Sequence, residues 1–289
     1  MPVARVHVML HGDSMSTLHH SQRLHRALRS AQDANKTALI PYITAGDPDL
    51  ATTGKILDAL VEAGSDVIEL GIPFSDPMGD GKTIQAAMAR ALNSGTTFAR
   101  VLKLVAEFRS RHAHTPLILF GYTNPLYRFG LAAASEAAQE AGADGFLVVD
   151  LPPEEASELT EHTRSRGLDF ICLFTPTTAP ERFETIRREA SGFAYCVSMT
   201  GVTGGAMDSL EDLGQRVATI RSETGLPVAV GFGIRSPEDA CRVARVADGV
   251  VVGSALIEAM ASCASKQAPT IAGQFIGSIR SALDATPRT

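Results

Sequence analysis

One glutamate lies where a charge is costly to desolvate. Residues 67–85 read VIELGIPFSDPMGDGKTIQ, an apolar run followed by a Gly/Pro-rich stretch, and Glu69 lies inside the apolar run. Side chains alternate faces along a strand. Glu69 therefore shares a face with Gly71, while the opposite face is purely apolar and should meet a covering layer. We expect Glu69 to point into the interior.

Glu69 has two interpretations. A structural carboxylate would need a nearby donor, but the predicted strands contain neither lysine nor arginine. A buried carboxyl group without a partner has a raised pKa and can carry a proton near neutral pH. We therefore favour a general acid–base role for Glu69.

Two aspartates, Asp76 and Asp80, follow in the Gly/Pro-rich stretch. Aspartate in such a loop is often a turn or cap residue, and Asp80 alone would be weak evidence of function. Its position adds weight, because this loop must pass over the end of the strand that carries Glu69.

Glycine clusters form a second signal. MTGVTGG, GFGIRSPED and VVGSALIEAM follow or end three consecutive apolar runs, and a short helix is expected to begin at Ser254. Gly-rich turns expose backbone N–H groups, and helix N-termini favour anions. The glycines could simply permit sharp turns, but three neighbouring clusters favour phosphate binding.

Several kinds of chemistry find no support in the sequence. None of the five lysines lies on a predicted strand, which disfavours a Schiff base, and no histidine lies at a strand end, which disfavours a His-ligated metal. Carboxylates, backbone dipoles and tyrosines remain for the chemistry. We expect acid–base catalysis on a small phosphorylated substrate without a cofactor.

The elements that must position these groups repeat along the chain. Short apolar runs alternate with stretches of helical period, which favours parallel strands covered on both faces. Eight such units predict an α/β fold, a (β/α)₈ TIM barrel whose site lies at the carboxyl ends of the strands. A doubly wound open sheet is disfavoured because no GxGxxG follows the first strand. The runs are residues 38–45, 66–72, 117–122, 145–150, 169–176, 193–198, 228–234 and 249–255.

Two helices are predicted outside the repeat. Residues 18–34 are amphipathic and could cap the bottom of the barrel, and residues 268–284 form a final helix. Residues 1–17 fit no element and are predicted to be a flexible tail, so residues 18–289 are expected to form one barrel domain. Five of the eight histidines fall within the first 25 residues, but their spacing is irregular and favours solvated side chains over a metal site.

Composition adds bounds on partners. The 289 residues carry a formal net charge of −6, which does not suggest binding to nucleic acid or to an anionic membrane. No apolar run reaches the length of a membrane span. The four cysteines lack CxxC spacing, and we interpret them as reduced packing residues of a cytoplasmic protein.

The sequence resembles the tryptophan synthase alpha subunit family. The resemblance rests on PYITAGDPD, LGIPFSDPMGDGKTIQ, YCVSMTGVTGG and GFGIRSPE, and covers roughly residues 38–260 in order. It implies a lyase of tryptophan biosynthesis that cleaves indole-3-glycerol phosphate to indole and glyceraldehyde 3-phosphate. It also implies a beta subunit partner, in an alpha2beta2 heterotetramer, with pyridoxal phosphate only on the beta subunit.

The resemblance also implies roles for individual residues. Glu69 would protonate indole C3 and then take the proton of the neighbouring hydroxyl, and Asp80 would hold the indole N–H. Tyr42 and Phe120 would flank the indole, Tyr122 would border the site, Tyr195 would approach Glu69, and Thr203 would lie in a closing loop. The phosphate would be held by Gly204, Gly233, Gly253 and Ser254.

This chain departs from the family at two positions beside Asp80. Gly79 and Lys82 stand where the family usually has alanine and proline, and both changes are expected to loosen the loop. An ammonium near Asp80 would favour its ionised form. The alternative is that Lys82 points to water, where such a pair contributes little. A stand-alone lyase that releases free indole, and a catalytically silent activator of a beta subunit, remain alternatives. A sugar-phosphate isomerase of this fold would need acidic residues at the ends of the first and fifth strands. It is disfavoured because residues 169–176, the fifth predicted strand, end without an acid.

Overall fold

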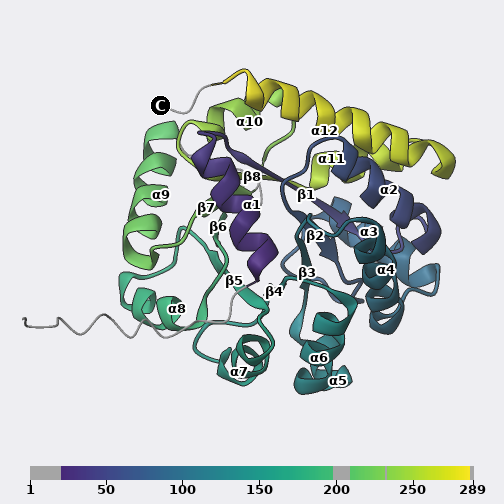
Figure 1. Cartoon of the computed structure of the whole chain (residues 1–289), viewed down its shortest axis with the longest axis horizontal. Helices are drawn as coiled ribbons and strands as arrows, with labels where there is room; N and C mark the ends of the chain where they lie inside the picture. The colour runs from purple at the N-terminus through teal and green to yellow at the C-terminus, as the bar shows by residue number, and fades with distance from the viewer. Residues whose placement is uncertain (1–20, 198–208, 232, 287–289) are drawn as a thin grey trace, which may run out of the picture.

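The chain forms a closed barrel of parallel strands surrounded by helices (Figure 1). The computed structural model describes residues 21–197, 209–231 and 233–286. Each strand pairs with the next in sequence, and the last pairs with the first, which excludes the open sheet and confirms the predicted barrel. The strands are β1 Ala38–Thr44, β2 Ile68–Gly71, β3 Leu117–Gly121, β4 Gly145–Val148, β5 Asp169–Phe174, β6 Ala194–Val197, β7 Val228–Gly231 and β8 Gly249–Val252.

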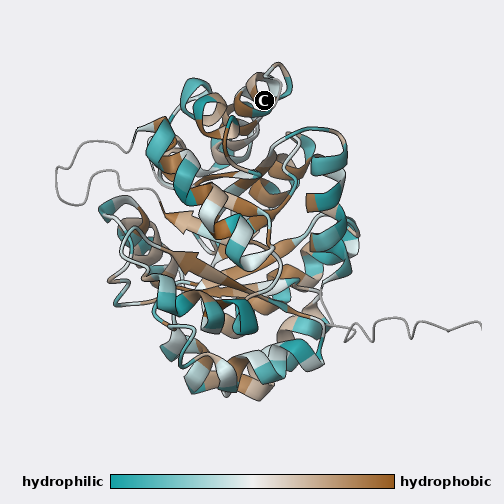
Figure 2. Ribbon diagram, turned by 90° about the vertical axis from the view of Figure 1, so that its left-hand side faces the viewer, coloured by the Kyte–Doolittle hydropathy of each residue, from teal (hydrophilic) through white to brown (hydrophobic). Residues whose placement is uncertain are grey.

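Helices follow the strands and cover the outside of the barrel. Figure 2 shows apolar strands at the centre and helices whose polar residues lie on the outside. The helix α12, Ala268–Asp284, has the bounds predicted for the final helix and packs against α2 and α10. The others are α1 Gln22–Asp33, α2 Leu50–Glu62, α3 Lys82–Asn93, α4 Phe98–Arg111, α5 Thr123–Phe129, α6 Leu131–Ala141, α7 Ser157–Ser165, α8 Phe183–Glu189, α9 Leu210–Thr224, α10 Pro237–Ala244 and α11 Ser254–Ala261.

The alternation of side chains along each strand divides the core into two parts. One face of β2 contributes Ile68 and Leu70 to the large apolar cluster between strands and helices. The opposite faces of the strands form a second cluster inside the barrel, which includes Ile118 and Leu147. Both faces of the strands are buried, and this explains why they appear in the sequence as continuous apolar runs.

Helix α1 closes the amino-terminal end of the barrel, as the amphipathic pattern predicted. Leu24, Leu28 and Ala31 are buried in the interior cluster. Ser21 caps the helix, because its hydroxyl accepts a hydrogen bond from the backbone N–H of Leu24 at 3.3 Å. Figure 1 shows α1 lying across the end of the barrel.

The bounds predicted for several strands differ from the observed ones. The predicted runs extend past the observed strands, because residues such as Ile72 and Tyr122 are buried but lie in the connections above the barrel. The short helix α5 after β3 was not predicted. The predicted tail, residues 1–17, lies outside the described residues. Within the part of the chain that the structure describes, no helix is both long and apolar enough to cross a membrane.

Candidate active site

Glu69 points into the barrel, as predicted. It lies on β2 beside Tyr42 of β1 and Ile118 of β3, and its side chain is fully buried. Neither carboxylate oxygen has a hydrogen-bond partner among the described residues. Burial raises the pKa of Glu69 to about 8, so the carboxyl group is protonated at neutral pH.

Two glycines make room for tyrosine rings beside Glu69. A Cβ at Gly71 would lie 2.3 Å from the hydroxyl oxygen of Tyr42, and one at Gly231 would lie 2.0 Å from that of Tyr195. Real Cβ contacts are essentially never this short, so any larger residue would displace the rings. Glycine at these positions lets both rings lean over the neighbouring strands.

Aromatic side chains form the wall of the site. The rings of Tyr42 and Phe120 meet edge to face with centroids 4.9 Å apart. Burial raises the pKa of Tyr195 well above its ordinary value, and a negative charge on Glu69, where present, raises it further. The electrostatic influence of Glu69 on Tyr195 agrees with the expectation that these two groups are close together.

Asp80 is held by Tyr122. The Tyr122 hydroxyl donates a hydrogen bond of 2.7 Å to Oδ2 of Asp80. Burial raises the pKa of Asp80 to about 6, although the hydrogen bond from Tyr122 opposes the rise. Asp80 is therefore largely ionised at neutral pH, whereas Glu69 is protonated.

Lys82 does not have the role that the sequence suggested. It is exposed at the start of α3, and it is not among the groups that shift the pKa of Asp80. The hypothesis of an ammonium beside Asp80 is wrong, because Asp80 is stabilised by a phenol on the neighbouring strand end instead.

Three of the residues predicted to bind phosphate, Gly233, Gly253 and Ser254, line the same cavity as Glu69 and Asp80. Gly233 has φ +76°, a backbone conformation that favours glycine. Gly253 precedes α11, and Ser254 begins that helix as predicted, so the first backbone N–H groups of α11 face this region. Thr203 and Gly204, also predicted for the site, lie outside the described residues.

One cavity of about 200 Å³ brings these groups together. Tyr122 is not part of its lining and lies behind Asp80. The sequence reasoning missed Ile84, an apolar residue in the first turn of α3 that gives no signal in the pattern. The described lining residues are Tyr42, Glu69, Asp80, Ile84, Phe120, Tyr195, Gly233, Ile234, Arg235, Val251, Gly253, Ser254 and Ala255.

Arg235 lies at the edge of this cavity and is committed elsewhere. Its side chain is 63% exposed and forms an ion pair with Glu258 of α11. Glu258 also accepts a hydrogen bond of 2.9 Å from the Thr83 hydroxyl. Glu258 thereby connects α11 with the start of α3 and with the connection after β7.

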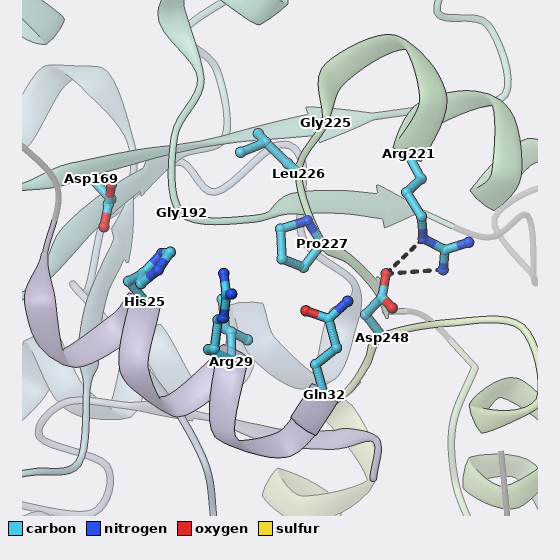
Figure 3. Close-up of a pocket in the computed structure, with 11 residues that line it drawn as sticks. His25, Arg29, Gln32, Asp169, Gly192, Arg221, Gly225, Leu226, Pro227 and Asp248 are labelled. Carbon is cyan, nitrogen blue, oxygen red and sulfur yellow. Dashed lines mark hydrogen bonds and ion pairs between the residues drawn. The ribbon is translucent and has the colours of Figure 1, made fainter. Parts of the chain in front are cut away.

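A larger pocket, about 420 Å³, lies at the opposite end of the barrel (Figure 3). It lies between α1 and the residues that precede β6, β7 and β8. Its acids already have partners: Arg221 donates to Oδ2 of Asp248 at 2.9 Å, and the backbone N–H of Ser21 donates to Asp169 at 3.1 Å. The described residues contain no group of three or more His, Cys, Asp or Glu side chains placed to hold a metal ion.

The fold and the cavity place the chain among (β/α)₈ barrels with an acidic pocket at the carboxyl ends of the strands. Residues 28–278 match the family model described as tryptophan synthase alpha chain. A curated relative, the tryptophan synthase alpha chain of Azoarcus sp. (strain BH72), is 47% identical over 265 residues, which are 92% of this chain and 98% of the relative.

Solved structures agree with this match. Tryptophan synthase subunit alpha from Legionella pneumophila is 40% identical with a TM-score of 0.85, covering 91% of this chain and 98% of that chain. A chain of the tryptophan synthase complex from Pyrococcus furiosus is 38% identical with a TM-score of 0.75, covering 85% and 98%. The chain belongs to the tryptophan synthase alpha chain family, and the resemblance found in the sequence is confirmed.

Proposed function

We propose that the chain is a lyase that cleaves indole-3-glycerol phosphate into indole and glyceraldehyde 3-phosphate, a reaction of tryptophan biosynthesis. The observation that carries the proposal is Glu69, a fully buried carboxyl group without a described hydrogen-bond partner, in one cavity with Asp80 and the Gly253–Ser254 turn. Family membership supports the same reaction.

The two carboxyl groups suit the two halves of this chemistry. Indole C3 must gain a proton before its bond to the glycerol chain breaks, and Glu69, with a pKa of about 8, carries that proton at neutral pH. Once deprotonated, Glu69 takes the proton of the adjacent hydroxyl as the carbon–carbon bond breaks. The proton gained by C3 stays on that carbon in the product, because the electron pair of the broken carbon–carbon bond returns to the ring and makes the indole aromatic again.

Asp80 stabilises the charge that forms on the indole. Protonation of C3 leaves a positive charge shared with the ring nitrogen, whose N–H becomes a stronger hydrogen-bond donor. Asp80, with a pKa of about 6, is largely ionised at neutral pH and would accept this hydrogen bond. Two carboxyl groups whose pKa values are separated by their surroundings can thus serve as acid and as charge stabiliser.

The remaining lining residues fit the rest of the substrate. Tyr42, Phe120 and Ile84 offer an apolar wall for the indole ring. The phosphate would be bound by the backbone N–H groups near Gly233 and at the start of α11, together with Ser254. Thr203 and Gly204, outside the described residues, remain expected contributors.

We further propose that the chain works with a beta subunit. Two large apolar side chains are exposed on neighbouring connections at the mouth of the barrel: Met78, 89% exposed, after β2, and Tyr127, 66% exposed, on α5 after β3. Such side chains favour a protein partner at this face. Pyridoxal phosphate would be carried by that partner, and the expected assembly is an alpha2beta2 heterotetramer in the cytoplasm.

Steady-state indole release from indole-3-glycerol phosphate, measured with and without an added tryptophan synthase beta subunit, tests this function. Cleavage that the beta subunit accelerates would support the complete proposal. Equal cleavage in both assays would identify a stand-alone lyase. Activation of the beta subunit without any cleavage would identify a silent activator and overturn the proposed reaction.

A further inference from the structure

A short chain of hydrogen bonds connects the loop after β2 to the end of β3. The backbone N–H of Gly79 donates to the Tyr122 hydroxyl at 3.1 Å, and that hydroxyl donates to Oδ2 of Asp80 at 2.7 Å. Because the phenol oxygen accepts from Gly79, its own proton is directed at Asp80. The position of Asp80 thus depends on how closely residue 79 approaches Tyr122.

Gly79 approaches Tyr122 by lying against Val149. A Cβ at position 79 would lie 2.6 Å from Cγ1 of Val149 and 3.3 Å from the Tyr122 hydroxyl oxygen. The φ angle of Gly79 is not in the left-handed region, so its backbone conformation is open to any residue. Glycine is required here by space, because a methyl group would collide with Val149.

Val149 is held in place by the hydrogen-bonded ends of β3 and β4, which are called the platform below. Its backbone N–H donates to the carbonyl of Gly121 at 2.9 Å, and it packs against the interior cluster. Next to it, Oδ1 of Asp150 accepts hydrogen bonds from the N–H and hydroxyl groups of Thr123 at 2.7 and 2.9 Å. These contacts tie the ends of β3 and β4 together, so an added methyl group would move the loop rather than the platform.

We propose that Gly79 and Val149 are a matched pair of positioning residues for Asp80. The glycine lets the loop come close enough for its N–H to orient the Tyr122 hydroxyl, and the valine fills the space that a larger residue 79 would take. Gly79 therefore seats the loop instead of loosening it, contrary to the expectation from the sequence. This inference rests on the proposed lyase reaction, in which Asp80 holds the indole N–H.

Four proteins test the pair: the parent, Gly79→Ala, Val149→Ala and the double variant. Gly79→Ala should lower kcat/KM for indole release by about tenfold, because the added methyl group overpacks the contact with Val149 and moves Asp80. Val149→Ala should lower kcat/KM by at most about threefold. The double variant should recover most of the loss caused by Gly79→Ala, because the new methyl group then has room.

Gly81→Ala is the matched control. Gly81 lies in the same loop with φ −72°, and no atom lies within 4 Å of a Cβ placed there. This change stiffens the backbone as Gly79→Ala does but creates no collision, so kcat/KM should stay near the parent value. Equal losses in Gly79→Ala and Gly81→Ala, or no recovery in the double variant, would overturn the proposal.

A second measurement does not depend on the substrate. The hydrogen bond from Tyr122 lowers the pKa of Asp80, so its loss should raise that pKa above about 6. NMR titration of the Asp80 carboxyl carbon should show this increase in Tyr122→Phe and in Gly79→Ala, and a return toward the parent value in the double variant. An unchanged pKa in Gly79→Ala would contradict the inference.

The two measurements separate failure of the inference from failure of the proposed function. If the parent releases no indole but the titrations follow the expected pattern, the reaction is wrong and the positioning of Asp80 stands. If the parent is active and the titrations do not differ, the positioning role is wrong and the reaction stands.

Discussion

The two ends of the barrel treat buried carboxyl groups in opposite ways. At the amino-terminal end, Asp144 is fully buried and receives hydrogen bonds from Arg23 at 2.8 Å and Arg109 at 2.9 Å, from the Ser21 hydroxyl at 2.6 Å and from the Leu117 N–H at 2.8 Å. At the carboxyl-terminal end, Glu69 is equally buried and has no described partner.

This difference separates structure from chemistry. A carboxylate surrounded by donors holds elements together: Asp144, just before β4, joins α1, α4 and the start of β3. A carboxyl group without donors holds a proton at neutral pH and can transfer it. A buried carboxyl group thus joins structural elements at one end of the barrel and is the proposed proton donor at the other.

The largest expected effect comes from removing the transferable proton. Glu69→Gln keeps the shape of the side chain, and we expect indole release to fall by about two to four orders of magnitude. Affinity for a phosphate-bearing ligand, measured by calorimetry, should change little because we expect backbone N–H groups near Gly233 and Ser254, and not Glu69, to bind the phosphate. Near-normal turnover would refute the assignment of Glu69.

Neutralising Asp144, the carboxylate that has donors, should lower stability and leave turnover unchanged. Asp144→Asn leaves the guanidinium of Arg109, whose side chain is only 14% exposed, without its charge partner, and we expect the free energy of unfolding to fall by about 3 kcal/mol. The folded enzyme should keep its turnover. Urea denaturation and steady-state assays of the same preparation check both parts, and a variant that loses turnover without losing stability would break the comparison.

The stability of the parent should depend on pH through Glu69. Its pKa is about 8 in the folded protein and 4.5 ordinarily, so the unfolded chain loses the proton first and stability falls as pH rises between these values. Glu69→Gln abolishes this fall. By linkage, its unfolding free energy relative to the parent should increase by roughly 3 kcal/mol between pH 4.5 and pH 7. If urea denaturation showed the same pH dependence for the parent and for Glu69→Gln, the pKa of Glu69 would not be raised.

The smallest effect is expected for the exposed cation at the mouth. If backbone N–H groups bind the phosphate, Arg235→Ala removes a surface ion pair with Glu258 worth about 1 kcal/mol or less and should raise KM by at most about fivefold. Gly233→Val should raise KM more, because a branched side chain is strained at a φ of +76°. A larger effect of Arg235→Ala would mean that the phosphate needs this cation.

The barrel and Glu69 could be predicted because both depend on local periodicity. Continuous apolar runs identify strands that are buried on both faces, and the alternation within one run points Glu69 inward. The absence of basic residues from the strands predicts that Glu69 has no ion-pair partner. These features are properties of single segments and need no knowledge of distant contacts.

The surroundings of Asp80 could not be predicted, because they arise from contacts between segments about 40 to 70 residues apart in the sequence. Tyr122 and Val149 are ordinary strand-end residues until the barrel places them beside the loop. The sequence suggested Lys82 as one possible partner of Asp80 because it is near in sequence, but Lys82 begins a helix and faces solvent, which was the alternative interpretation.

Helix α1 leaves only one end of the barrel for the passage of substrate and products. Because Leu24 and Leu28 close the amino-terminal end, substrate and both products must pass through the mouth formed by the connections after the strands. Indole would leave on the face where Met78 and Tyr127 are exposed. A partner docked there would receive the indole directly, so a helix at the bottom of the barrel helps to decide where the product goes.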